Sequence, residues 1–152
     1  MAVGAEPAVP ARVGATAIAV CAPLALLAVW LVAIPADHAW RASTIELLQS
    51  YAALLVAACA GARFGMTATD AGHRMRRTLL IGALPVLAGW IALRLDLPWS
   101  FAVLGLAASA QGAWDSFAVH RGELPLWFGR CRAWIAFAAV AAMVAGFAVT
   151  AS

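Results

Sequence analysis

The carboxylates that stand inside apolar stretches are the residues of this sequence best suited to chemistry, because an ionisable group is costly to bury there. One stretch opens with a polar group made of Glu46, Gln49, Ser50 and Tyr51. Such a group can form a vestibule for a small ligand or a proton, or it can lie hydrated at a membrane surface. Residues 53–62, which follow, carry no hydrogen-bonding side chain except Cys59. The sequence therefore favours the second interpretation.

A second carboxylate, Asp115, stands where an arginine can reach it. Arg63 and Arg132 lie at the ends of other apolar stretches, and the expected chain path brings them to the same level as Asp115. We expect an ion pair between Asp115 and one of these two arginines. Gln111 precedes Asp115 by one helical turn and offers a polar group deeper in the same stretch.

The histidines and cysteines show no metal or haem pattern. The histidines all fall between apolar stretches: His38, His73 and His120. A membrane haem needs paired histidines within facing helices, and the sequence has no CxxC spacing. Nucleophile elbows, Walker loops, HExxH and Rossmann fingerprints are also absent from the sequence. We therefore expect no catalytic, cofactor-binding or metal-binding residue and no enzyme activity.

Long apolar stretches must position these side chains. The 152 residues are 65% hydrophobic and 11% charged, whereas soluble domains have about 25% charged residues. Charged residues gather between the apolar stretches, as in membrane spans joined by loops. The sequence predicts an all-α integral membrane protein, a single bundle of five transmembrane helices over residues 14–152 after a flexible tail over residues 1–13. The predicted spans are 14–34, 45–64, 78–93, 99–117 and 133–150.

The span at 45–64 is the least apolar of the five, and its second half is rich in small residues. Residues three or four apart share one side of a helix, and one such side carries Glu46, Ser50, Ala53, Ala57 and Gly61. Small residues let membrane helices approach closely. We expect this side, which ends in a GxxxG pair, to face other helices.

The arginines set the expected orientation. All ten cationic residues are Arg, and with a cytoplasmic N-terminus only Arg41 and Arg94 fall on the outer side. The other eight fall on the inner side: Arg12, Arg63, Arg74, Arg76, Arg77, Arg121, Arg130 and Arg132. This positive-inside bias predicts a multi-pass protein of the bacterial inner (cytoplasmic) membrane with a periplasmic C-terminus. The expected partners are membrane lipids and other inner-membrane proteins; a net charge of +3 does not indicate nucleic acid.

The second basic loop is predicted over residues 118–132 and contains an apolar run around Trp127. Amphipathic indole rings settle at membrane interfaces. This run is the best candidate for a segment that lies along the membrane surface, or for a patch that docks a partner.

Four stretches carry a family resemblance: Tyr51 to Gly65, Leu84-Pro85 with Gly89-Trp90, Gln111-x-x-Trp114-Asp115, and the Leu-Pro-Leu-Trp-Phe-Gly-Arg-Cys-Arg run over 124–132. In this order, over about residues 45–148, they resemble the family known as domain of unknown function 3429. That family includes a mitochondrial transmembrane protein, number 69 in its naming series, of which this chain looks like a bacterial relative. The resemblance implies a five-helix inner-membrane protein and supplies no activity.

Three classes of function remain open. A non-enzymatic structural, assembly or accessory component of a membrane complex is favoured by the small-residue faces and by the lack of reactive groups. A small transporter or channel acting as a homo-oligomer needs a polar cavity near the midplane. A membrane enzyme acting on a lipid or a quinone needs clustered acid and base residues at one interface, where the sequence offers only Asp115, histidines and arginines.

Overall fold

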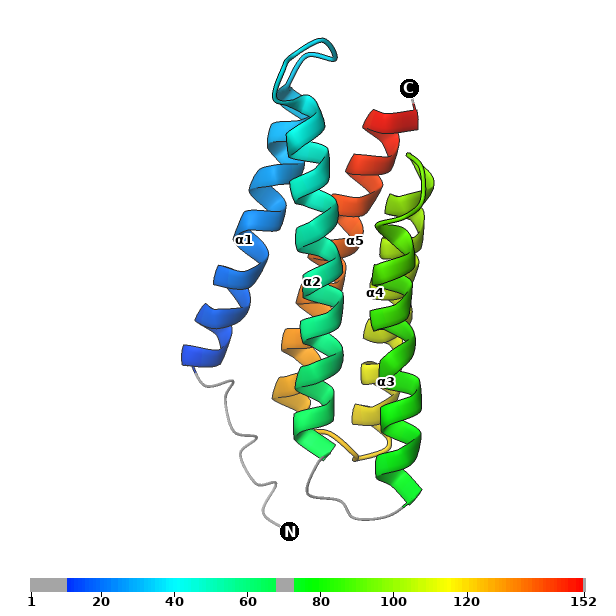
Figure 1. Cartoon of the computed structure of the whole chain (residues 1–152). Helices are drawn as coiled ribbons and strands as arrows, with labels where there is room; N and C mark the ends of the chain where they lie inside the picture. Colours follow the sequence, from blue (N-terminus) through cyan, green and yellow to red (C-terminus); the bar gives the residue numbers. More distant parts are fainter. Residues whose placement is uncertain (1–10, 68–72, 152) are drawn as a thin grey trace.

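The computed structural model describes residues 11–67 and 73–151, and this part of the chain is all-helical, as the sequence predicts. Five helices follow one another along it: α1 (Ala11–Ala33), α2 (Arg41–Thr67), α3 (His73–Ala92), α4 (Trp99–His120) and α5 (Leu126–Ala151). They lie side by side, and successive helices run in opposite directions (Figure 1). The bundle architecture expected from the sequence is therefore present.

Length and hydropathy make three of these helices candidates to cross a membrane. The qualifying stretches are Val13–Ala33 in α1, Arg41–Met66 in α2 and Leu126–Ala151 in α5. In the described part of α3 the apolar stretch, Leu79–Ala92, is shorter.

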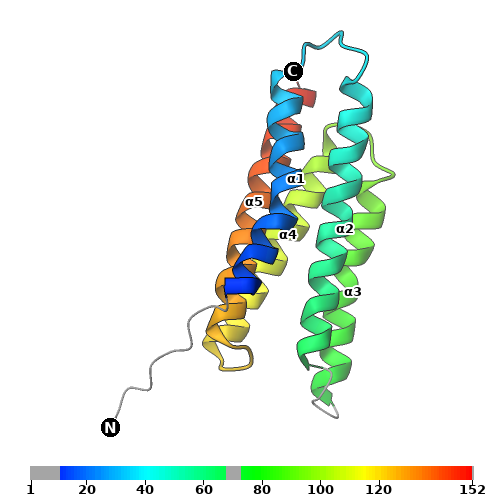
Figure 2. The same cartoon turned by 90° about the vertical axis from the view of Figure 1, so that its left-hand side faces the viewer.

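The helix α2 lies at the centre of the arrangement. It contacts each of the other four helices, while α1 packs beside α5 and α3 packs beside α4. Figure 2 shows α1 and α5 together on one side and α2 and α3 together on the other. The least apolar of the predicted spans is thus the one with the most helix neighbours.

Several helices extend beyond the predicted spans. α2 starts at Arg41, α3 at His73 and α5 at Leu126, so the loop predicted over 118–132 is wrong except at its centre. Hydropathy detects only the apolar part of a helix, whereas polar and basic residues also form helical turns readily. Ala11 to Val13, assigned to the tail, belong to α1; residues 1–10 lie outside the described part.

The prediction for the face of α2 is wrong at both ends. Glu46, Ser50 and Gly61 are exposed, although Ala53 is buried. A Cβ atom added at Gly61 or Gly65 would meet nothing within 4 Å. The buried side of α2 instead carries Leu48, Ala52, Leu55, Val56, Cys59 and Arg63. Large aliphatic side chains remove more surface from solvent than small ones and therefore decide which side faces the core.

Helices α4 and α5 approach each other closely through glycines. A Cβ atom at Gly112 would lie 2.7 Å from Cβ of Ala136, and one at Gly146 would lie 2.8 Å from the ring of Phe101. Phe101 is fully buried. These two glycines therefore fix the separation of α4 and α5 along most of their length.

Replacing Gly112 with alanine should lower the thermal stability of the protein in detergent. The new methyl group meets Ala136, which has no flexible side chain to move aside, and overpacking of this kind costs about 1–3 kcal/mol. Thermal unfolding followed by tryptophan fluorescence measures the effect. Gly61→Ala is the matched control, because its methyl group enters open space; equal melting temperatures for the two variants would contradict the prediction.

Candidate functional site

Asp115 of α4 is fully buried and is shared by two arginines. Arg63 of α2 donates from Nη1 to Oδ1, and Arg132 of α5 donates from Nε to Oδ2 over 2.7 Å. Both arginines are also buried. The sequence predicts a pair with one of them, and the structure brings both to the carboxylate. We call these three residues the Asp115 cluster; it ties α2, α4 and α5 together.

The positions of the three residues follow from their helices. Arg63 lies one turn before the end of α2, Arg132 lies in the second turn of α5, and Asp115 faces both from the last third of α4. Gly112 is one turn from Asp115 on α4, and its lack of a side chain lets α5 come close enough for Arg132 to reach the carboxylate. Close helix packing and the ion pair therefore depend on each other.

An aromatic ring extends the cluster toward the end of the bundle. The guanidinium of Arg63 lies 5.4 Å from the ring centroid of Trp114, and that of Arg121 lies 5.6 Å from it, within cation–π range. Arg121 also holds Glu123 with two hydrogen bonds of 2.8 and 3.1 Å. These two residues are far more exposed than the Asp115 cluster.

The chemistry open to the cluster is limited by its contacts. Both oxygens of Asp115 accept hydrogen bonds from guanidinium groups, so each oxygen of the carboxylate is already engaged by the protein. Among the described residues, no three His, Cys, Asp or Glu side chains gather as metal ligands would. The geometry is that of a buried ion-pair network that holds α2, α4 and α5 together.

Further hydrogen bonds join α2 to its neighbours. Gln49 donates to Ser100 of α4 at 2.6 Å, and the hydroxyl of Tyr51 donates to the backbone oxygen of Val20 in α1 at 2.7 Å. Gln111 of α4 donates to the backbone oxygen of Val56 at 3.3 Å. In a low-dielectric interior such bonds satisfy groups that would otherwise be costly to bury.

The vestibule, which was the alternative that the sequence disfavoured, is not assembled. Glu46 and Ser50 are exposed, whereas Gln49 and Tyr51 point to different helices. These residues also lie near the start of α2, while Arg63 lies near its other end. The polar groups of α2 therefore serve separate contacts rather than one site.

Arg41 is a residue that the sequence analysis missed. Its guanidinium donates to the backbone oxygen of Ile34 at 3.2 Å and to that of Val149 at 3.0 Å. Both acceptors belong to the C-terminal ends of helices, where carbonyl groups lack helical partners and the dipole is negative. The sequence carries no signal for this role, because Arg41 meets the ends of the two helices only in the folded structure.

Trp127 lies in the first turn of α5 rather than in a separate surface segment. The loop before it and the turn itself fold against α4, with Leu124, Phe128 and Ala118 buried together. The rings of Trp127 and Phe128 meet edge to face with centroids 5.9 Å apart. Most of the apolar run is thus used in closing the α4–α5 connection.

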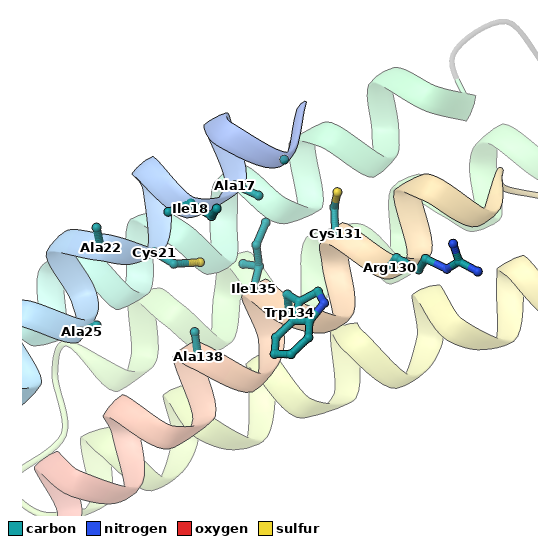
Figure 3. Close-up of a pocket in the computed structure, with 11 residues that line it drawn as sticks. Ala17, Ile18, Cys21, Ala22, Ala25, Arg130, Cys131, Trp134, Ile135 and Ala138 are labelled. Atoms are coloured by element: carbon teal, nitrogen blue, oxygen red, sulfur yellow. The ribbon is translucent and has the colours of Figure 1, made fainter. Parts of the chain in front are cut away.

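Two apolar grooves open on the sides of the bundle. One runs between α1 and α5, where cavities of about 580 and 660 Å³ share Ala25, Trp134 and Ala138. Figure 3 shows side chains from both helices, among them Cys21 and Ile135, lining the first of these cavities. The other groove, about 470 Å³, lies between α2, α3 and α4 and reaches Arg63, Gln111 and Trp114.

Comparison with known proteins gives the family of the chain. A model of the family described as protein of unknown function (DUF3429) matches residues 9–148. The chain belongs to this family. No curated protein and no solved structure matches it.

Asp115→Asn should strongly destabilise this DUF3429 protein. An amide cannot neutralise the two buried arginines, and breaking a buried pair costs about 3–5 kcal/mol. We expect a lower folded yield in detergent and a lower melting temperature. Glu123→Gln is the control, because it breaks a solvent-exposed ion pair with Arg121, and such pairs contribute little to stability. Unchanged melting and expression of Asp115→Asn would contradict the prediction.

Replacing the whole cluster with apolar residues should restore much of that stability. Substituting a buried ion group by hydrophobic residues of similar size is often neutral or stabilising. The triple variant Arg63→Met, Asp115→Leu, Arg132→Met should therefore melt above Asp115→Asn in the same detergent. A triple variant that melts as low as Asp115→Asn would show that the arginines act through something other than their mutual charge balance.

Proposed function

We propose that this chain is a five-span protein of the bacterial inner membrane, with a cytoplasmic N-terminus, that acts without catalysis as a structural or assembly component of a membrane complex. The observation that carries the proposal is the α1/α5 groove. It is an exposed apolar surface along the length of a helix, built mainly from small residues.

The exposed surface of the bundle supports the membrane placement. Each helix exposes large apolar side chains, for example Leu26, Leu54, Leu84, Leu106 and Phe137. Soluble monomers rarely expose apolar patches of more than a few hundred Å². In a membrane, lipid chains would cover the exposed apolar side chains of all five helices.

Helix α4 has the length of a membrane span, and α3 has this length when its basic first turns are counted with its apolar stretch, Leu79–Ala92. α3 and α4 contain 20 and 22 residues, and about 20 residues of helix cover the roughly 30 Å of the hydrocarbon core. The charge that lowers the apolar character of α4 is Asp115, which is buried and paired. Paired charges that face the bundle interior are the form in which membrane helices tolerate carboxylates.

The α1/α5 groove fits a transmembrane helix of a partner protein. Along α1 it is lined from Gly14 to Ala33, and 20 helical residues extend about 30 Å, the thickness of the whole hydrocarbon core. A lipid covers one leaflet only, whereas a helix covers both. Small residues in the groove let a partner backbone approach closely.

Two features favour a different protein over a second copy as the occupant. A symmetric dimer needs a surface that is complementary to itself, and a groove is concave in both copies. The exposed side chains of Trp134 and Phe137 border it, at 73% and 71% exposure. They leave room for one inserted helix rather than for a facing groove.

The packing between α2, α4 and α5 weighs against a transport path through a single chain. The void lined by Cys59, Gln111 and Arg132 measures about 10 Å³, room for one water molecule at most. The Asp115 cluster crosses the same level of the bundle. Transport through one chain would require the ion pairs of this cluster to break.

Filling the groove should release the partner. Ala25 is exposed and lines both cavities of the α1/α5 groove, so Ala25→Phe should reduce recovery of a stoichiometric membrane partner in mild detergent at least about tenfold, a loss of roughly 1.4 kcal/mol or more in binding. Ala19→Phe is the matched control, since Ala19 is exposed on the same helix and lines neither cavity.

Three outcomes would overturn this proposal. The first is equal recovery of the partner by both variants. The second is a purified protein whose dimer is lost in Ala25→Phe, which would make a second copy the occupant. The third is a wild-type protein that is recovered alone under every mild solubilisation condition.

A further inference from the structure

The helices do not all end at one level on the side of the bundle where α2 begins, which is the outer side in the proposed orientation. Arg41, the first residue of α2, bonds to the backbone oxygens of Ile34, just after α1, and of Val149, near the end of α5. These three helix ends therefore share a level, which we call the Arg41 level. The turn between α3 and α4 lies below it, as Figure 2 shows.

Two contacts indicate how far below the Arg41 level this turn lies. Gln49, which bonds to Ser100 in the first turn of α4, lies eight residues after Arg41, about 12 Å along the helix axis. A Cβ atom at Gly89 would lie 3.6 Å from Cβ of Ala53, which is about 18 Å along α2 from its start. Because Gly89 is three residues before the end of α3, both contacts place the turn about 12–14 Å below the Arg41 level.

At the inner end of the bundle, the Asp115 cluster holds α2, α4 and α5 at one level. From its start to Arg63, α2 extends about 33 Å, slightly more than the roughly 30 Å of the hydrocarbon core. From Trp99 to Asp115, α4 extends only about 24 Å, and the apolar stretch of α3, Leu79–Ala92, is about 21 Å long. The bundle is therefore shorter on the side of α3 and α4, and the difference lies at the outer end.

The side chains around the turn between α3 and α4 are typical of a membrane–water interface. Arg94 and Asp96 are exposed in the turn, and charged groups are costly to place in hydrocarbon. Trp90 and Trp99 flank the turn and are 62% and 65% exposed, and amphipathic indole rings settle at interfaces. The guanidinium of Arg94 lies 5.7 Å from the centroid of the Trp90 ring. These residues favour contact of the turn with water and lipid headgroups.

A flat membrane surface at the level of this turn does not fit the other side of the bundle. The hydroxyl of Tyr51, about 15 Å along α2 from its start, bonds to Val20 of α1. Val20 therefore lies near the level of the turn, and Val29 lies about 14 Å further out. Val29 and Val32 are 68% and 59% exposed, so a surface at the turn would leave both in water. A flat surface at the Arg41 level would instead place the charged turn in hydrocarbon.

We propose that the outer leaflet is thinned beside α3 and α4, so that lipid headgroups reach the turn between them, about 12 Å below the Arg41 level. A bilayer can adapt to a short hydrophobic stretch by becoming thinner around it, at a modest cost in free energy. Among the described residues, α3 contacts only α2 and α4, so it lies at the edge of the bundle, where lipid can adapt to it. This inference rests on the membrane placement proposed above, but not on the partner helix.

Labelling of introduced cysteines with a membrane-impermeant maleimide tests the thinning, with the purified protein in vesicles of dioleoyl phosphatidylcholine. Leu95→Cys lies in the turn, and Ala19→Cys lies beside Val20 on α1, at a similar level; both positions are exposed. Ala36→Cys, between α1 and α2 at the same end of the bundle, is the accessible reference, so the orientation of the protein in the vesicles affects it and Leu95→Cys equally. Labelling of the native cysteines is measured in the wild type and subtracted. We expect Leu95→Cys to be labelled as fully as Ala36→Cys, and Ala19→Cys to lose nearly all labelling.

The thickness of the bilayer provides a second measurement. In vesicles of dierucoyl phosphatidylcholine, whose chains are longer, thinning to the same level is more costly, so labelling of Leu95→Cys should fall while that of Ala36→Cys is unchanged. Labelling of Leu95→Cys that does not depend on chain length would overturn the proposal, because a water-filled crevice of fixed shape would then give access.

The variant on α1 separates this proposal from the membrane placement. Protection of both Leu95→Cys and Ala19→Cys in dioleoyl vesicles would overturn the thinning and leave the membrane placement intact. Full labelling of Ala19→Cys would contradict the membrane placement itself, and the thinning with it.

Discussion

The shared carboxylate of Asp115 is the interaction on which the rest of the bundle depends. One anion between two buried guanidinium groups fixes three helices at a single level. An isolated buried charge would cost several kcal/mol, so α2, α4 and α5 can pack only where all three groups meet. The close approach at Gly112 is part of the same constraint, since Arg132 reaches Asp115 only if α5 lies against α4.

At the opposite end of the bundle, an arginine joins helices through backbone oxygens instead of a carboxylate. Arg41 bonds to backbone oxygens at the ends of α1 and α5, so it needs no carboxylate. Arg41 and Arg63 lie near opposite ends of α2, and Gln49 and Tyr51 bind other helices between them. This explains why the least apolar helix is central: its polar side chains find partners on several neighbours, which an outer position would not offer.

The sequence was sufficient for the number and the approximate location of the helices, because long apolar stretches separated by charges leave few alternatives. It also pointed to Asp115 and its two possible arginines, since an ionisable residue in such a stretch must be paired. It could not show that both arginines share the carboxylate, because that depends on the relative rotation of three helices. The buried side of α2 was mistaken for the same reason: small residues at Ser50 and Gly61 permit close contact, but Leu48, Leu55 and Val56 determine where burial is greatest.

The position of the Asp115 cluster also limits where a binding site can be. Because the Asp115 cluster and its neighbours fill the space between α2, α4 and α5, a ligand or partner must approach from the side, through surfaces that face the surrounding medium. The α1/α5 groove is lined by Arg130 at one end, and the groove between α2, α3 and α4 is lined by Arg63. Arg63 therefore helps to hold three helices together and also lines a lateral groove, so that an occupant of this groove would lie beside the contact on which the bundle depends.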